Sequence, residues 1–133
     1  MRSDTQSVSI EAPAARVHAL VADPLNLPRW AVGFARAVRP QGEGWIVSTA
    51  SGEVGLRVAA SPATGTVDFH LSPAPGVEVL AASRVVPRGE ASEFVFTQFQ
   101  APGMSEETFR ASIAALRHEL AVLKALAEVQ CPL

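Results

Sequence analysis

The chain has 133 residues, of which 48% are hydrophobic and 18% are charged, and its formal net charge is −2. This length and composition predict one globular domain, residues 1–133, with a hydrophobic core of its own. The lack of a basic excess gives no reason to expect a nucleic-acid partner, and no apolar run reaches the ~20 residues of a membrane span.

The N-terminal quarter predicts a short strand followed by two short helices. Residues 5–10 alternate between polar and apolar side chains, as a half-buried strand does. Pro13 suits the first turn of a helix, and Asp23-Pro24 ends that helix because the residue before a proline avoids the helical region. Residues 25–30 form a short turn or second helix, broken by Pro28. The apolar face of the first helix consists of Val17, Leu20 and Val21.

From residue 34 onward the hydrophobic period changes to two, which predicts a run of strands. Turns rich in glycine and proline separate them, and no helix intervenes, so the strands form an antiparallel meander. The predicted strands are Phe34–Arg39, Trp45–Ala50, Val54–Ser61, Thr66–Leu71, Val77–Val86 and Ser92–Phe99.

The last element is a long amphipathic helix over residues 105–128, after a break at Pro102-Gly103. Ser105 is the predicted N-cap, and acidic residues follow it in the first turn. With about 100° per residue, one narrow apolar stripe forms. Its members are Phe109, Ile113, Leu116, Leu120, Leu123 and Ala127. Such a stripe needs an apolar partner, so we predict an α+β fold with this helix on a curved antiparallel sheet.

Residues 7–31, SVSIEAPAARVHALVADPLNLPRWA, contain a strand, an Ala-Pro helix start and an Asp-Pro…Pro-x-Trp turn. With the order of the other elements, this segment resembles the START/Bet v 1-like (SRPBCC) superfamily, most of all its bacterial polyketide cyclase/dehydratase-like branch. The resemblance covers nearly the whole chain. It implies a helix-grip fold, in which a seven-stranded sheet wraps around the C-terminal helix and leaves a cavity. Members bind apolar small molecules and some are enzymes, but they share no catalytic motif.

Alternation along the predicted strands divides the sheet into two faces. The face toward the helix is apolar with a few hydroxyls and one amide, whereas Arg57, Asp68, His70, Glu78, Arg84 and Glu93 collect on the outer face. The inner face suits an apolar ligand oriented by a few hydrogen bonds. We therefore predict no catalytic residue. The predicted ligand-binding residues are Trp30, Phe34, Trp45, Val47, Thr49, Leu56, Val58, Phe69, Leu71, Val79, Ala81, Ser83, Phe96, Gln98, Met104, Phe109, Ile113 and Leu116.

The three histidines predict neither a metal site nor a catalytic one. His70 shares a strand face with Asp68, which makes a solvated outer pair the expected reading and a catalytic pair the alternative. His118 falls on the solvent side of the last helix, and His18 flanks the first helix as a surface or half-buried residue. None has a second histidine four residues on. We expect no metal and no cofactor.

Two tryptophans leave a structural and a functional reading open. Trp30 is either a lid over the mouth of the cavity or a core plug that anchors the short helix. Trp45 starts an inner-face strand, where core packing is favoured over stacking on a ligand.

Three functions follow from these patterns. The leading one is a protein that binds an apolar small molecule in the cavity. The second is an enzyme of the cyclase or dehydratase type, which needs a titratable group inside, such as His70 or Arg84 turned inward by a bulge. The third is a homodimer that acts through its surface while side chains fill the cavity. Cytoplasmic location is the expectation, because residues 1–20 lack a signal-peptide pattern and the single Cys131 excludes an internal disulfide.

Overall fold

The computed structural model describes residues 2–129, so Cys131 lies outside the described residues. The architecture is α+β, as predicted. The elements are β1 (Ser3–Ile10), α1 (Ala14–Ala22), the 3-10 turn η1 (Pro24–Asn26), α2 (Leu27–Trp30), β2 (Ala37–Gln41), β3 (Gly44–Thr49), β4 (Gly52–Ser61), β5 (Thr66–Ala74), β6 (Val77–Arg88), β7 (Ala91–Phe99) and α3 (Glu106–Glu128).

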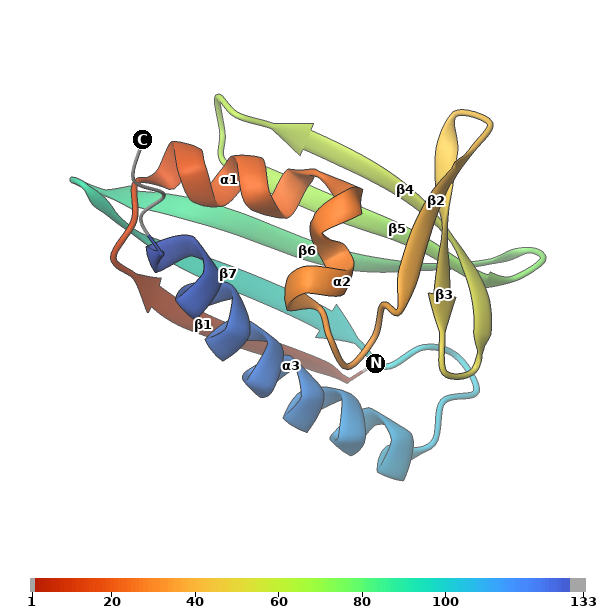
Figure 1. The fold of residues 1–133 in the computed structure, drawn as a ribbon. Coiled ribbons are helices and arrows are strands. Elements are labelled where there is room, and N and C mark those ends of the chain that lie inside the picture. The colour runs from red at the N-terminus through yellow and green to blue at the C-terminus, as the bar shows by residue number, and fades with distance from the viewer. Residues whose placement is uncertain (1, 130–133) are drawn as a thin grey trace.

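Seven strands form one antiparallel sheet in the order β1-β7-β6-β5-β4-β3-β2. β2 to β7 are the predicted meander, and β1 adds to the far side of β7 (Figure 1). One predicted strand starts too early. Phe34 lies in a turn, where its backbone N–H donates to the Ala31 carbonyl at 3.0 Å, and β2 begins only at Ala37.

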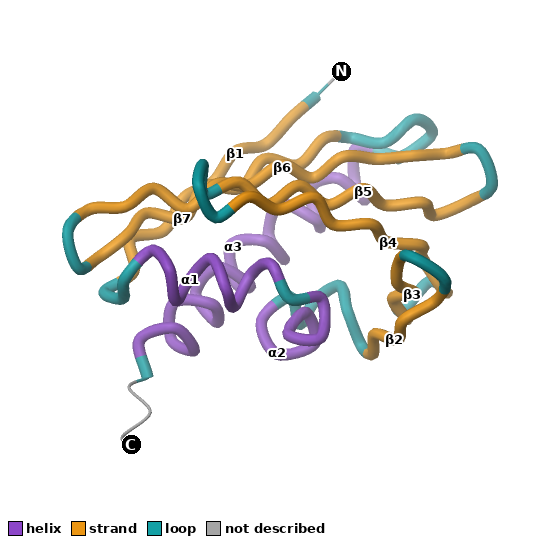
Figure 2. Tube along the Cα trace, turned by 90° about the horizontal axis from the view of Figure 1, so that it is seen from above, coloured by secondary structure: helices purple, strands orange, loops and turns teal. Residues whose placement is uncertain are grey.

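The molecule has two layers, with the sheet on one side and all three helices on its concave side (Figure 2). α3 runs along β1 and contacts α1 and α2. Its N-cap is Ser105, whose Oγ accepts the Thr108 backbone N–H at 3.0 Å, and Leu116, Leu120 and Leu123 of the predicted stripe are buried. The helix-grip fold is therefore confirmed.

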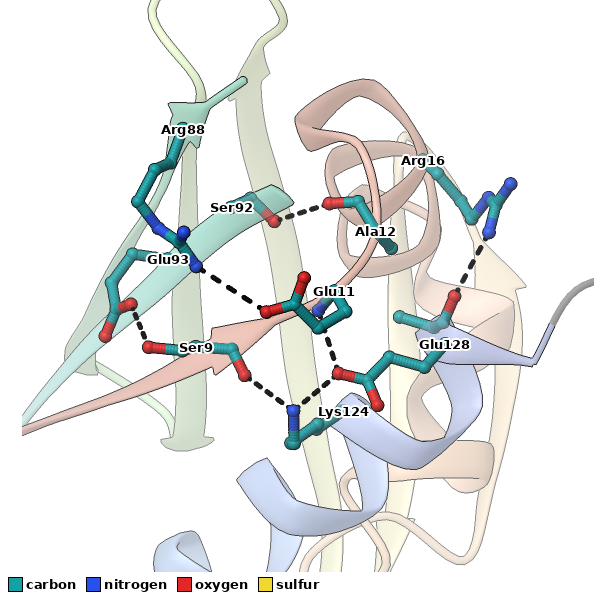
Figure 3. Close-up of polar contacts among 10 residues, drawn as sticks. Ser9, Glu11, Ala12, Arg16, Arg88, Ser92, Glu93, Lys124 and Glu128 are labelled. Carbon is teal, nitrogen blue, oxygen red and sulfur yellow. Dashed lines mark hydrogen bonds and ion pairs between the residues drawn. The ribbon is translucent and has the colours of Figure 1, made fainter. Parts of the chain in front are cut away.

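The C-terminal end of α3 is tied to the turn between β1 and α1 by side-chain hydrogen bonds (Figure 3). Lys124 Nζ donates to the Ser9 carbonyl at 2.9 Å and to Glu128 Oε2. The same Glu128 oxygen accepts the Glu11 backbone N–H at 2.8 Å, and Arg16 reaches the Ala127 carbonyl. We call residues 9–12 together with residues 124–128 the latched end.

Away from the latched end the sheet opens between β6 and β7. The pairing of β6 with β7 starts at Ala82 and Thr97, so residues 77–81 of β6 have no partner in β7. Beyond that point β6 continues as a hairpin with β5, whereas Gln98 and Phe99 stay paired with β1. The two strands therefore part below the N-terminal half of α3.

Among residues 2–129, no helix is long and apolar enough to cross a membrane.

Candidate functional site

A cavity of about 300 Å³ lies where the sheet, α2 and the middle of α3, residues 112–119, meet. Its walls are mostly apolar. The lining residues are Leu27, Trp30, Ala31, Gly33, Phe34, Leu56, Phe69, Leu71, Val79, Leu80, Ala81, Phe96, Gln98, Phe99, Met104, Ser112, Ala115, Leu116 and Glu119. Leu80, one of these residues, is 37% exposed. The volume shows that the side chains do not fill this space.

The cavity brings together many of the residues that alternation placed on the inner face. β4, β5 and β6 contribute through their inward positions, and aromatic rings of Phe69 and Phe96 lie 6.2 Å apart. The predicted residues that line the cavity are Trp30, Phe34, Leu56, Phe69, Leu71, Val79, Ala81, Phe96, Gln98, Met104 and Leu116.

The other predicted residues lie on the same side of the fold but outside the cavity. Val47 is buried in the core, and Trp45 and Val58 pack against it. The hydroxyl of Thr49 donates to the Gly52 carbonyl, and that of Ser83 donates to the Val67 carbonyl.

Two predicted residues of α3 are occupied elsewhere. Phe109 is fully buried beneath the Arg2 guanidinium, which lies 5.1 Å from the ring centre. Ile113 is half-buried, and its carbonyl accepts the Gln6 side-chain amide.

Trp30 is both a core residue and part of the cavity wall. It is 2% exposed and meets Phe94 edge to face, with ring centres 6.2 Å apart. Of the two alternatives, a lid or a core residue that anchors the short helix, this burial favours the core residue. Its indole N–H is buried and has no hydrogen-bond partner among the described residues. A buried donor without an acceptor costs about 1–3 kcal/mol.

Glu119 places a carboxyl group in this apolar wall. It comes from α3, is buried, and lies opposite the chain that follows α2. The Gly33 N–H donates to Glu119 Oε2 at 2.9 Å. A Cβ at position 33 would lie 3.2 Å from that oxygen and 3.3 Å from the Cβ of Ala115. Glycine is therefore what lets the backbone approach the carboxyl.

Burial raises the pKa of Glu119 from 4.5 to about 7. The backbone N–H groups of Gly33 and Phe34 favour the ionised form and oppose that rise. Loss of hydration is the larger effect, so the carboxyl is poised between its two protonation states near neutral pH. Such a group can both donate and accept a proton.

The other polar side chains of the cavity direct their donors into the protein. Gln98 Nε2 donates to Asp4 Oδ2 and to the Ser112 carbonyl, both at 3.3 Å. Ser112 Oγ donates to the Thr108 carbonyl at 3.2 Å. These contacts join β7, β1 and α3 at the side of the cavity. The Glu119 carboxyl is therefore the polar group best placed to orient a ligand.

Glu119 is also the residue that the strand-face argument missed, because that argument considered only the sheet. On the helical wheel it lies about 80° from Phe109, beside Leu116 and Leu123 at helical spacings of three and four. A single acidic residue at the edge of the apolar stripe of a helix could have indicated a buried carboxyl.

Seven further lining residues were not predicted from the sequence: Leu27, Ala31, Gly33, Leu80, Phe99, Ser112 and Ala115. Leu80 and Phe99 reach the cavity because β6 and β7 separate there.

The histidines stay outside the cavity. His70 Nδ1 lies 2.8 Å from Glu78 Oε1, so its partner is this diagonal neighbour on β6 and not Asp68 on its own strand. His118 is exposed as predicted. His18 is more buried than expected, because its Nε2 reaches the Thr66 carbonyl at 3.1 Å. Within residues 2–129, no three His, Cys, Asp or Glu side chains gather as metal ligands would.

Comparisons with known proteins agree with this geometry. The family model described as "Polyketide cyclase / dehydrase and lipid transport" matches residues 1–128. The comparison with curated proteins finds no match.

Solved structures of similar fold include the protein XoxI from Bacillus cereus, which is 18% identical with a TM-score of 0.77 over 96% of each chain. The Zhui aromatase/cyclase from Streptomyces sp. R1128 is 19% identical, with a TM-score of 0.75 over 96% of this chain and 93% of that one. The di-domain ARO/CYC BexL from the BE-7585A biosynthetic pathway is 25% identical with a TM-score of 0.74, and the match covers 94% of this chain and 46% of that one.

Proposed function

The chain belongs to the polyketide cyclase/dehydrase and lipid transport family, and on that premise we propose that it binds an apolar small molecule in the cavity. The observation that carries the proposal is the open space of about 300 Å³ between sheet, α2 and α3, with apolar walls and one buried carboxyl. Ligand sites in proteins have this character, and this volume is at the small end of their range. The expected ligand is accordingly compact.

A cavity-filling substitution tests this proposal directly. Ala81 lies on the inner face of β6 and lines the cavity, whereas its neighbour Ala82 points to the other face. Ala81→Leu should lower the affinity for naphthalene, read from its fluorescence, by at least about tenfold, because a new side chain occupies the ligand's volume. Ala82→Leu is the matched control and should leave it unchanged. Equal effects of the two changes, or no binding to the wild-type protein, would reject the proposal.

The second candidate function is an enzyme of the cyclase or dehydratase type, and Glu119 is the observation that favours it. Catalysis of this type needs a titratable group inside the cavity. Neither His70 nor Arg84 lines the cavity, but Glu119 does. A carboxyl that changes protonation state near pH 7 can serve as both base and acid in such an elimination. The carboxylate takes the α-proton of a β-hydroxy ketone, and the resulting acid gives that proton to the β-hydroxyl, which leaves as water while the C=C bond forms.

Turnover of such a substrate separates an enzyme from a binding protein. Formation of an enone from a small aromatic β-hydroxy ketone, followed by ultraviolet absorbance, should be faster with wild-type protein than with Glu119→Gln. The amide keeps the shape of the side chain but cannot transfer the proton. Equal rates for wild type, Glu119→Gln and buffer alone would leave the binding function as the sole candidate.

The third hypothesis was a homodimer that acts through its surface while side chains fill the cavity, and the cavity of about 300 Å³ does not favour the filled part of it. The alanine-rich back of α3, with Ala111, Ala114, Ala121 and Ala125, is exposed. One similar fold is described as the Aha1 dimer from Colwellia psychrerythraea, 14% identical with a TM-score of 0.74 over 97% of this chain and 98% of that one. Sedimentation of the wild type against Ala114→Glu tests it, since a charge on that face should dissociate a dimer.

A further inference from the structure

We propose that Glu119 makes the cavity selective for neutral ligands that carry a carbonyl oxygen and turns away ligands that carry a carboxylate. The inference rests on the proposed binding function and adds the chemical class of the ligand. It excludes fatty acids and other organic anions as preferred ligands of this chain.

The first step is that few hydrogen-bond donors of the cavity are free to bind a ligand. Those of Gln98 and Ser112 already donate to carbonyl and carboxylate oxygens of the protein. When Glu119 is protonated, its O–H is a donor within the cavity. A cavity that offers donors to an apolar ligand is complementary to an acceptor such as a carbonyl oxygen.

The second step is the position of the carboxyl. Glu119 Oε2 already accepts the Gly33 N–H, and the close approach of residue 33 fixes that oxygen against the backbone. The carboxyl is thus held at the edge of the cavity and cannot swing into solvent without losing this bond. A ligand that enters must meet the same group in the same orientation.

The third step is charge. No cationic side chain lines the cavity among the described residues. The charged or titratable neighbours on the surrounding elements are bonded to other groups or exposed. Arg29 on α2 bonds to Asn26, and Asp4 on β1 accepts the side-chain amides of Gln6 and Gln98. Arg36, Arg117 and His118 are exposed. A ligand carboxylate would therefore stand beside Glu119 in an apolar space with no positive charge, which disfavours it strongly.

An ammonium ligand is the remaining possibility for a carboxyl, and the cavity suits it poorly. It would form a buried ion pair with Glu119, and the loss of hydration of both charges outweighs their attraction unless further hydrogen bonds satisfy the ammonium. The apolar walls offer few acceptors for its three N–H groups. A neutral carbonyl makes its one hydrogen bond without moving a charge out of water.

The sign of the pH dependence follows. Burial raises the pKa of Glu119 to about 7, and a carbonyl ligand binds the protonated form because only that form donates. Binding therefore takes up a proton, and affinity should fall as the pH rises through 7, approaching about tenfold per pH unit. Replacement by glutamine supplies an N–H donor at every pH.

Four matched naphthalene probes test the inference: naphthalene, 2-acetylnaphthalene, 2-naphthoate and 2-naphthylmethylamine, titrated at pH 6, 7 and 8. At pH 6 the ketone should bind the wild type at least about tenfold more tightly than the carboxylate. Its affinity should fall by about fivefold from pH 7 to 8, because the protonated fraction of a group with a pKa of about 7 falls from about one half to about one eleventh. In Glu119→Gln the ketone affinity should not change with pH. Glu107→Gln, the same substitution at an exposed position of α3, should keep the wild-type dependence.

Calorimetry of the wild type provides a second reading that needs no variant. At pH 7, titration of the ketone in two buffers of different ionisation enthalpy should show uptake of about half a proton per ligand bound. Ketone binding that is independent of pH, carboxylate binding as tight as that of the ketone, or amine binding that strengthens with pH would each overturn the inference. If naphthalene and all three derivatives fail to bind, the proposed function itself fails, and this distinguishes the two.

Discussion

The C-terminal end of α3 and its middle are held to the rest of the molecule in different ways. At the latched end, Lys124 and Glu128 bond to the end of β1 and the turn that follows it, and Leu123 is fully buried in the core (Figure 3). Along residues 112–119 the same helix lines the cavity and buries the carboxyl of Glu119. The difference indicates that packing at the latched end offsets the cost of a cavity that buries a carboxyl, as is common for functional sites.

Leu116 and Leu123 lie on the same face of α3, and their replacement should show most strongly how the two regions differ in stability. Leu123 is 0% exposed and surrounded by core residues, whereas Leu116 is 3% exposed but borders the cavity. Leu→Ala costs about 2–5 kcal/mol, and the loss grows with the volume of the void left behind and the contacts removed. Leu123→Ala should fall near the upper value and Leu116→Ala near the lower one. Urea unfolding with an unchanged m-value measures both, and equal losses would contradict the comparison.

Glu119→Gln should stabilise the protein at high pH. Below pH 4.5 the carboxyl is protonated in both the unfolded and the folded chain, so wild type and variant should be equally stable. As the pH rises from 4.5 to about 7, the unfolded chain ionises first and the wild type loses stability. The shift amounts to about 3 kcal/mol, which the variant should regain at pH 8.

Urea unfolding at pH 4, 6 and 8 checks this prediction. A variant less stable than the wild type at pH 8 would show that the carboxylate, with its bonds from residues 33 and 34, is favourable where it lies. A gain would place Glu119 among groups kept at a cost to stability for the sake of a function.

Much of the fold and part of the site followed from local patterns. Alternation put Leu56, Phe69 and Val79 on the inner face, and they line the cavity, because the side-chain period of a strand is a local property. The long helix, its N-cap and its stripe were equally local. The resemblance to the SRPBCC superfamily, confirmed by the family match, added the way these elements pack.

The rest of the site depends on where distant segments meet. Leu80 alternates toward the outer face, yet it reaches the cavity because β6 and β7 separate beyond Ala82. Phe34 fits the alternating pattern of a strand, but it lies in a turn in which its backbone N–H donates to the Ala31 carbonyl. Glu119 becomes part of the site only because Gly33 comes close to it. None of these distances is encoded in a short window of sequence.

The latched end has a pH dependence opposite to that of Glu119, and a smaller one. The pKa of Glu128 is lowered, first by the Glu11 backbone N–H and then by the Lys124 ammonium. A lowered pKa contributes stability above the ordinary carboxyl pKa, and this contribution is lost as the pH falls.

Glu128→Gln should therefore lower the melting temperature at pH 7 and have less effect near pH 3. The loss at pH 7 should be smaller than that of either leucine change, because the pair is exposed to solvent and salt. A deficit that persists unchanged at pH 3 would show that the charge of Glu128 contributes nothing.

The smallest effect is expected for His70→Ala, although His70 is the neighbour of Phe69. The two residues share a strand but point to opposite faces: Phe69 is 4% exposed and lines the cavity, while His70 bonds to Glu78 on the outer face. His70→Ala should change stability by no more than about 0.5 kcal/mol, as a surface substitution does, and leave naphthalene binding as in the wild type. Phe69→Ala and Phe96→Ala should alter that binding, because both rings form the wall. Loss of binding in His70→Ala, with no change in the phenylalanine variants, would mean that the ligand lies on the outer face of the sheet. The contrast between the middle and the C-terminal end of α3 would then say nothing about function.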